Sequence, residues 1–290
     1  MSTRAGAGGR ELIRWKEDYT AYLMILPAVS YIVLFSFYPS LEAIYGSFQT
    51  PTRHFVLVNY NELVGLGVDR AIYNTIVVTV CALALQFTIA LAIATILTRE
   101  FRGRWFFQVS YIIPFGVATI VSVYVFGNIF EITGGYANAI LRGLGLHTLE
   151  WTEHTNYWLN VLTLVIADSW KNTPIVAIIL VSGMSTISPD IYAAAKVDGA
   201  GPFSRFIHIT IPNLSGYIAI ALIIRGISEF NIFAMALLLF PHEILTTLVY
   251  GLFTTTFNDY LSYAAATVLL AFILVFATIV VVYRNRSVAG

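Results

Sequence analysis

Charged residues are scarce in this sequence. Only 11% of the 290 residues are Asp, Glu, Lys or Arg, and 58% are hydrophobic, whereas an ordinary soluble protein carries about 25% charged residues. With a mean hydropathy of +0.78, this composition excludes an ordinary soluble domain and is typical of a membrane protein. The sixteen basic and sixteen acidic side chains balance, so the chain lacks the basic surface that nucleic-acid binding needs. We therefore expect no nucleic acid among its partners.

Cysteine and lysine are also rare, which excludes several kinds of chemistry. The single cysteine, Cys81, has no partner for a disulfide or a CxxC metal site. The three lysines, Lys16, Lys171 and Lys196, all lack the preceding glycine of a Walker A loop. GxSxG, HExxH and GxGxxG motifs do not occur, and the five histidines have no metal-ligand spacing. We therefore expect no catalytic residue, no metal site and no cofactor bound by this chain.

Long uncharged runs predict six membrane-spanning helices, because about 20 mostly apolar residues cross a bilayer core. The predicted spans are 20–41, 73–98, 105–130, 157–183, 214–240 and 261–283. We predict an all-α polytopic membrane protein with an N-terminal segment 1–19, a transmembrane domain 20–283 and a C-terminal tail 284–290. Prolines inside or beside the spans are expected to kink helices, and these are Pro27, Pro39, Pro114 and Pro174.

Positive side chains fall mostly on one side of the predicted membrane. With the N-terminus inside, the inside segments hold eleven of the sixteen Lys and Arg residues, and the outside loops hold Arg53, Arg70 and Arg142. Because short cytoplasmic loops are enriched in Lys and Arg, we expect a multi-pass plasma-membrane protein with both termini in the cytoplasm. The outside segments 45–72 and 131–156 are long enough to fold locally or to serve only as connectors.

The predicted cytoplasmic segment between the fourth and fifth spans, here called the 184–214 loop, contains residues that typically start and end a short helix. Pro189 can start a helix, which the run 191–197 continues. Gly199 can take the left-handed conformation of a C-cap, and Pro202 cannot continue the helix. The sequence therefore predicts a short surface helix that ends in a sharp turn.

This loop resembles the EAA motif of the membrane subunits of ABC importers, which reads Glu-Ala-Ala, three residues, Gly, nine residues, Ile-x-Leu-Pro. The spacing is intact, and there are two departures, Ala193 for the motif Glu and Ile211 for the motif Leu. Asp198, Ala200 and Phe206 fit the carbohydrate group of these permeases. The resemblance assigns contacts with an ATPase subunit to Ala194, Ala195, Asp198, Gly199, Ala200, Arg205, Ile209 and Pro212.

The likeness extends over about residues 20–283. The segment from Leu26 to Phe48 resembles the family's first span with its Leu-Pro and Tyr-Pro pairs, and Asn74-Thr75 resembles the opening of the second. Phe55, Asn59 and Tyr60 fit the segment between them. These features are similar to the first permease of a maltose-type or glycerol-phosphate-type heterodimer.

The resemblance implies a permease subunit that forms half of the path for a sugar or related solute. Its expected partners are a second permease, two ATPase subunits that bind ATP and Mg²⁺, an extracellular solute-binding protein and membrane lipid. The loop helix, called the coupling helix, would dock on an ATPase, so hydrolysis would lie in a separate subunit. The alternatives are a self-contained secondary transporter with a coupling ion at Asp168 or Glu229, and a membrane-embedded enzyme or structural anchor.

Charged residues in the fourth and fifth spans are candidates for the solute path. A charge at membrane depth costs at least ~2.5–3.5 kcal/mol and usually faces a cavity or a partner. Arg225 with Glu229 at i and i+4, and Asp168 with Lys171 at i and i+3, either line the path or form structural ion pairs. Adding the polar and aromatic neighbours that could bind a sugar gives the set Asp168, Trp170, Lys171, Asn172, Arg225, Glu229, Phe230 and Asn231.

Overall fold

The computed structural model describes residues 7–50 and 54–289, and that part of the chain is helical apart from loops and one isolated antiparallel bridge between Gln49 and Phe55. Residues 1–6 of the predicted N-terminal segment, Arg53 of the charge count and the last residue of the predicted tail lie outside the described residues. The all-α class predicted from the sequence is confirmed.

Five helices are long and apolar enough to cross a membrane, and a sixth span results if one bent helix pair is counted as a unit. The first is built from α1 (Ala7–Ile32), a π-helical turn (Val33–Phe37) and α2 (Tyr38–Ser47). The other long helices are α4 (Val68–Leu97), α8 (Tyr157–Ser185), α11 (Ile211–Phe230) and α14 (Asp259–Ala289). The shorter ones are α3 (Val58–Gly65), α5 (Arg104–Gly116), α6 (Thr119–Ile129), α7 (Tyr136–Gly143), α9 (Pro189–Val197), α10 (Pro202–Arg205), α12 (Ala234–Leu239) and α13 (Leu245–Thr254), and a second π turn covers Phe206–Thr210.

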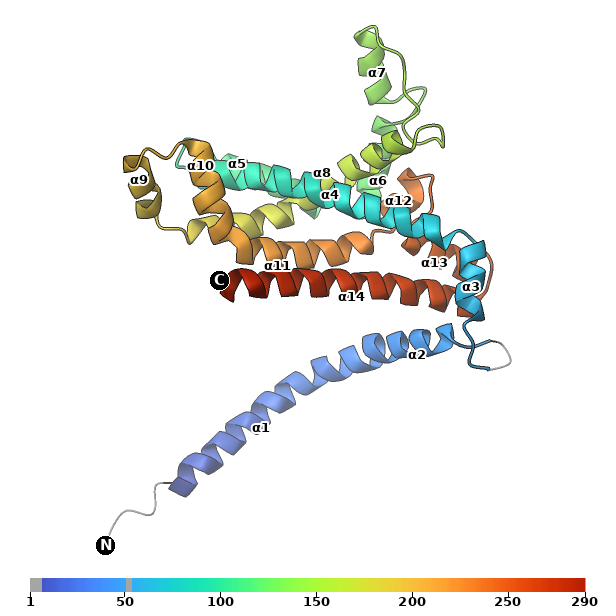
Figure 1. Ribbon diagram of the computed structural model, residues 1–290, viewed down its shortest axis with the longest axis horizontal. Coiled ribbons are helices and arrows are strands. Elements are labelled where there is room, and N and C mark those ends of the chain that lie inside the picture. The colour runs from blue at the N-terminus through green and yellow to red at the C-terminus, as the bar shows by residue number, and fades with distance from the viewer. Residues whose placement is uncertain (1–6, 51–53, 290) are drawn as a thin grey trace.

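Helices α4, α8 and α11 form the centre of the molecule. Small residues on α4, such as Ala90 and Ala94, are fully buried against α8 and α11, so the helices approach closely there. Gly183 of α8 faces Tyr217 and Leu214 of α11, and a Cβ at this glycine would lie 2.6 Å from Tyr217. Helix α14 lies beside α11, and α1 diverges from the bundle (Figure 1).

The 184–214 loop, with α9 and α10, lies at one end of the long axis (Figure 1). The C-terminal end of α14 lies toward the same end, as does the N-terminal end of α1. Helices α3 and α13 lie at the other end, and α7 projects from the bundle on that side. This arrangement separates the predicted inside segments from the predicted outside segments along one axis.

The predicted third span, 105–130, is not one straight helix. Helices α5 and α6 meet at 96°, because Val117 and Ala118 between them have extended backbone conformations. Pro114 lies just before the break and lacks the N–H that would continue the helical hydrogen bonds.

The predicted fifth span, 214–240, is shifted along the chain. The observed span is Pro202–Phe230 and includes α10 and the π turn before α11. After Phe230 the chain leaves the helix at Asn231 and begins the separate short helix α12 at Ala234. The fifth span therefore reaches directly from the 184–214 loop to Phe230.

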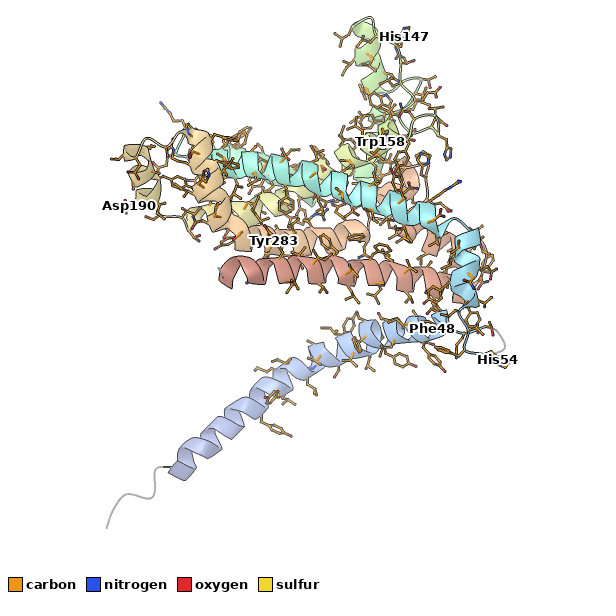
Figure 2. All side chains as sticks on the ribbon, in the orientation of Figure 1. Phe48, His54, His147, Trp158, Asp190 and Tyr283 are labelled. Atoms are coloured by element: carbon orange, nitrogen blue, oxygen red, sulfur yellow. The ribbon has the colours of Figure 1, made fainter. Side chains whose placement is uncertain are left out.

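The segment 131–156 is locally folded around Asn138, whose side chain is fully buried. Its Nδ2 donates hydrogen bonds to the carbonyls of Ile132 and Leu149, both at 2.9 Å. Its Oδ1 accepts from the Leu149 N–H and from the indole Nε1 of Trp151. The segment is thus an ordered element on the side of the molecule where Figure 2 places His147 and Trp158.

Candidate functional sites: the 184–214 loop and a buried charge network

Helix α9 begins and ends where the sequence predicts. Ser188 is the N-cap and its side chain accepts a hydrogen bond from the Asp190 N–H at 3.3 Å. Gly199 has φ +81°, a conformation that costs a residue with a Cβ roughly 1–2 kcal/mol. The Ala200 N–H donates to the Ala195 carbonyl at 2.8 Å and closes the end of the helix.

Large apolar side chains are exposed on the loop among polar and charged ones. Val197 is 89% exposed and Phe203 is 75% exposed, and Asp190 marks the outward end of α9 (Figure 2). Exposed apolar side chains flanked by polar ones are typical of a protein–protein contact. Of the residues assigned to ATPase contacts, Ala194, Asp198, Gly199 and Pro212 are exposed and Ala195, Ala200, Arg205 and Ile209 are half-buried.

The loop is tied to the membrane helices at its inner side. The hydroxyls of Tyr192 on α9 and Thr210 before α11 lie 2.9 Å apart, and Thr210 is buried. Between the loop and the end of α4 lies a cavity of about 690 Å³, here called the loop cavity. Arg99, Lys196 and Arg205 line it together with Ala193 and Tyr192.

A second candidate site is a buried polar network that joins α4, α8 and α11. Arg225 contacts the carboxylates of both Asp168, at 3.5 Å, and Glu229. The Gln86 amide nitrogen donates to Asp168 at 2.9 Å and to Glu229 at 2.8 Å, and the Arg225 Nε donates to the Gln86 oxygen at 3.1 Å. Asn172 adds a hydrogen bond to Asp168 at 2.8 Å. Five side chains from three helices are thus linked at the centre of the bundle.

Asp168 and Lys171 do not form the ion pair that was one of the two alternatives for them. The Lys171 ammonium donates to the Val117 carbonyl at 2.5 Å and lies 3.5 Å from the carbonyl of Phe115. These carbonyls lie at the α5–α6 break, where the helix no longer supplies donors for them. Asp168 instead pairs across helices with Arg225.

The structure brings together only part of the predicted solute-path set. Asp168, Arg225 and Glu229 are buried in the network, and Phe230 is buried and packs on Phe276 of α14 with ring centroids 5.4 Å apart. Trp170 is 41% exposed and lines an apolar cavity of about 450 Å³ with Tyr111 and Pro114, among others. The Asn231 side chain is exposed and bonds its own helix at the Ile227 carbonyl.

Gln86 is the network member that the sequence analysis missed. It lies in an uncharged run, so a search for charged residues passes over it. An amide in the middle of a 30-residue apolar helix is itself a signal, since polar side chains in such helices usually bond to other helices.

Comparisons with known proteins place the chain among membrane transport components. Residues 86–289 match the family described as binding-protein-dependent transport system inner membrane component. The trehalose/maltose transport system permease protein MalF of Thermococcus litoralis is 31% identical over 232 residues, which cover 76% of this chain and 77% of the relative.

Two further comparisons agree with this placement. The arabinooligosaccharides transport system permease protein AraP of Bacillus subtilis is 30% identical over 245 residues, with 82% of this chain and 77% of the relative covered. The same fold occurs in the crystal structure of a bacterial ABC transporter involved in the import of the acidic polysaccharide alginate. A chain of that transporter aligns with a TM-score of 0.82 at 21% identity, over 96% of this chain and 99% of its own length.

Proposed function

Since the chain belongs to the family of binding-protein-dependent transport system inner membrane components, we propose that it is the permease subunit of an ABC importer for a carbohydrate-type solute. It forms half of the translocation path, and a second permease of similar fold supplies the other half. The sugar class is supported by its relatives, which are named for trehalose, maltose and arabinooligosaccharides.

The observation that carries this proposal is the exposed apolar surface of the capped 184–214 loop. Helix α9 and the turn at Gly199 hold the motif positions in one rigid unit. Val197 and Phe203 belong to this unit, and most of the surface of each is exposed. A cytoplasmic ATPase subunit with a complementary apolar cleft would cover both side chains.

The loop is well connected to the centre of the bundle, which suits a role in coupling. From Pro202 to Phe230 the chain forms one nearly continuous helical segment. Its far end carries Arg225 and Glu229, which bond to Gln86 of α4 and Asp168 of α8. A displacement of the loop by the ATPase would therefore move the network that links three helices.

In this proposal the complete importer contains this chain, a second permease, two ATPase subunits and an extracellular solute-binding protein. ATP and Mg²⁺ bind in the ATPase subunits, and hydrolysis takes place there. The chain spans the plasma membrane several times with both termini in the cytoplasm. The excess of Lys and Arg on that side supports this orientation, as does the location of the N-terminal end of α1 and the C-terminal end of α14 toward the α9 end.

A secondary transporter fits the buried network poorly. A coupling-ion site requires several carboxylate oxygens that are free to bind the ion, whereas both oxygens of Asp168 and the Oε1 of Glu229 are engaged by Arg225, Gln86 and Asn172, and only the Glu229 Oε2 has no partner. The network is better suited to hold α4, α8 and α11 together.

The docking proposal is tested by purifying the tagged chain in mild detergent and identifying the proteins that come with it by mass spectrometry. We expect a P-loop ATPase and a second multi-span permease with the wild type. Phe203→Asp should lose the ATPase, because a carboxylate would be buried in the contact. Leu144→Asp is the matched control, since Leu144 is 69% exposed near α7. Retention of the ATPase by Phe203→Asp, or its absence from the wild type, would contradict the proposal.

A further inference from the structure

The loop cavity has an unusual charge composition. Three cationic side chains line it, those of Arg99, Lys196 and Arg205, and no carboxylate lines it in the described part of the chain. The acidic residues of the same segments, Glu100, Asp190 and Asp198, are exposed and do not contribute to its lining. The cavity therefore has a positive potential that no lining side chain neutralises.

None of these three cationic side chains has a protein partner among the side chains that the structure describes, those of residues 19, 20, 22–50 and 54–284. They form no ion pair and no side-chain hydrogen bond there. The Nε of Arg205 is buried and lacks an acceptor, although a buried donor without an acceptor is energetically unfavourable. Arginine is suited to bind an anion with several N–H groups at once. An anionic ligand would remove this cost.

Position 193 explains why the cavity lacks an internal anion. Ala193 lines the cavity one helical turn before Lys196. It is the residue that replaces the acidic first position of the loop motif. A glutamate here could reach the cationic side chains, whereas the alanine methyl group leaves the space open.

The location of the cavity indicates which anionic compounds could reach it. One wall is the last turn of α4, with Thr95 and Thr98 at the end of a membrane-spanning helix. In the proposed orientation this wall is the cytoplasmic end of α4, where lipid headgroups are expected, and basic pockets between membrane helices on the cytoplasmic side bind anionic headgroups. We propose that the loop cavity binds a phosphate-type anion, supplied by an acidic lipid headgroup or by a soluble phosphate compound, and thereby orders the loop.

The test measures the melting temperature of the full chain, purified with its co-purifying subunits and stripped of loosely bound lipid. One arm adds inorganic phosphate and compares it with sodium chloride at equal ionic strength, which controls for screening. The other arm adds phosphatidylglycerol and compares it with phosphatidylcholine. We expect phosphatidylglycerol to raise the melting temperature. Protection by inorganic phosphate as well would identify a soluble anion as a sufficient ligand.

Two variants and a control make the test specific. Arg205→Gln removes one cationic group, and Ala193→Glu supplies an internal carboxylate at an exposed helical position where folding should be retained. Both should weaken the protective effect, with an affinity about tenfold lower, the factor expected for the loss of one charge-assisted hydrogen bond. Arg102→Gln changes an exposed arginine outside the cavity and should behave as wild type.

Either of two results would overturn the proposal. One is a melting temperature of the wild type that neither anion raises above its control. The other is equal protection of the wild type, Arg205→Gln and Ala193→Glu, because binding would then not involve the loop cavity. The experiment needs no transport activity, so its outcome is independent of the proposed import function.

Discussion

At the scale of single residues, Arg225 supplies the positive charge that balances the buried carboxylates at the centre of the bundle. It is the only cation that contacts Asp168 and Glu229 in the described structure, and all three side chains are at least nine-tenths buried. Removing one partner from such a group leaves buried charges without compensation, which typically costs 3–5 kcal/mol.

Arg225→Met is therefore expected to reduce the free energy of unfolding by about 3–5 kcal/mol. The side chain keeps much of its apolar volume, so the loss reports the missing charge. Thermal melting in detergent measures it. Arg225→Lys should recover part of the loss, and Arg70→Met, at an exposed position at the start of α4, should change stability by less than about 0.5 kcal/mol. Equal stability of Arg225→Met and Arg70→Met would show that the network contributes little.

His242 is expected to make the outer end of the molecule sensitive to acid. Burial lowers the pKa of His242, and the nearby His154 lowers it further, while Asp69, Arg70 and Tyr157 lie around the same pocket. Because its pKa in the folded state lies below the ordinary value of about 6.5, protonation favours unfolding. Stability is unaffected above pH 6.5 and falls as the pH drops from 6.5 toward the lowered pKa.

The prediction is a lower melting temperature at pH 5.5 than at pH 7.5, with a smaller difference for His242→Gln. Asn160 lies 3.1 Å from the His242 ring nitrogen and can bond the glutamine amide instead. An unchanged pH dependence in this variant would assign the effect to other groups.

The sequence predicted a side-chain pairing within one helix correctly but did not predict the pairings between helices. Arg225 and Glu229 are paired as their i, i+4 spacing predicts. The i, i+3 spacing also allowed Asp168 to pair with Lys171, but Arg225 on a neighbouring helix takes that place. Neither this pairing nor the contribution of Gln86 can be read from spacing, because both depend on how the helices pack.

At the scale of elements, α9 is the part of the structure that the sequence determines most fully. Its boundaries follow from Pro189 at the start and Gly199 at the end, both of which act through local backbone geometry. A Cβ at Gly199 would meet nothing within 4 Å, so the glycine is needed for its conformation alone.

Gly199→Ala is expected to destabilise the end of α9 by roughly 1–2 kcal/mol, the cost of a left-handed conformation with a Cβ. Hydrogen exchange at residues 195–201 measures this locally and should be faster by about tenfold. Gly201→Ala is the matched control, because Gly201 has φ −67° and open space around it. Equal exchange in the two variants would mean that the turn does not depend on the φ of residue 199.

The α5–α6 break is the element that hydropathy could not predict. The run 105–130 contains no charged residue, and a count of apolar residues gives the length of a span but not the direction of its helix axis. Pro114 indicates a kink, but the sequence does not show that Lys171 of α8 donates to the Val117 carbonyl at the break, where the helices meet at 96°. The end of the fifth span at Phe230 escaped prediction for a similar reason, since α12 continues the apolar composition after the break.

Lys171→Met should loosen this break, because the Val117 carbonyl loses a charged donor that contributes about 1.5–3 kcal/mol. Faster hydrogen exchange at residues 116–122 is the expected result, with Lys171→Arg closer to wild type. If exchange there is unchanged in Lys171→Met, the break is maintained by the backbone and packing of α5 and α6 alone.

At the scale of the whole molecule, the 184–214 loop and the buried charge network lie at opposite ends of the fifth span. The span Pro202–Phe230 joins them, and Gln86 of α4 and Asp168 of α8 bond to its far end. In the proposed function, a displacement of the loop would reach α4 and α8 through these contacts. The first span contributes little to this centre, since none of its most apolar window is buried within the chain. Its surface is available to lipid or to the second permease.

The most direct test of this account is solute uptake by proteoliposomes that contain the chain with its co-purifying subunits and solute-binding protein. Labelled trehalose and maltose are suitable first solutes, given the names of the relatives. The account predicts that uptake requires hydrolysable ATP on the side of the vesicle membrane where the ATPase subunits lie. Uptake should persist when ionophores abolish the ion gradients. Uptake that proceeds without ATP and follows an imposed proton or sodium gradient would contradict it.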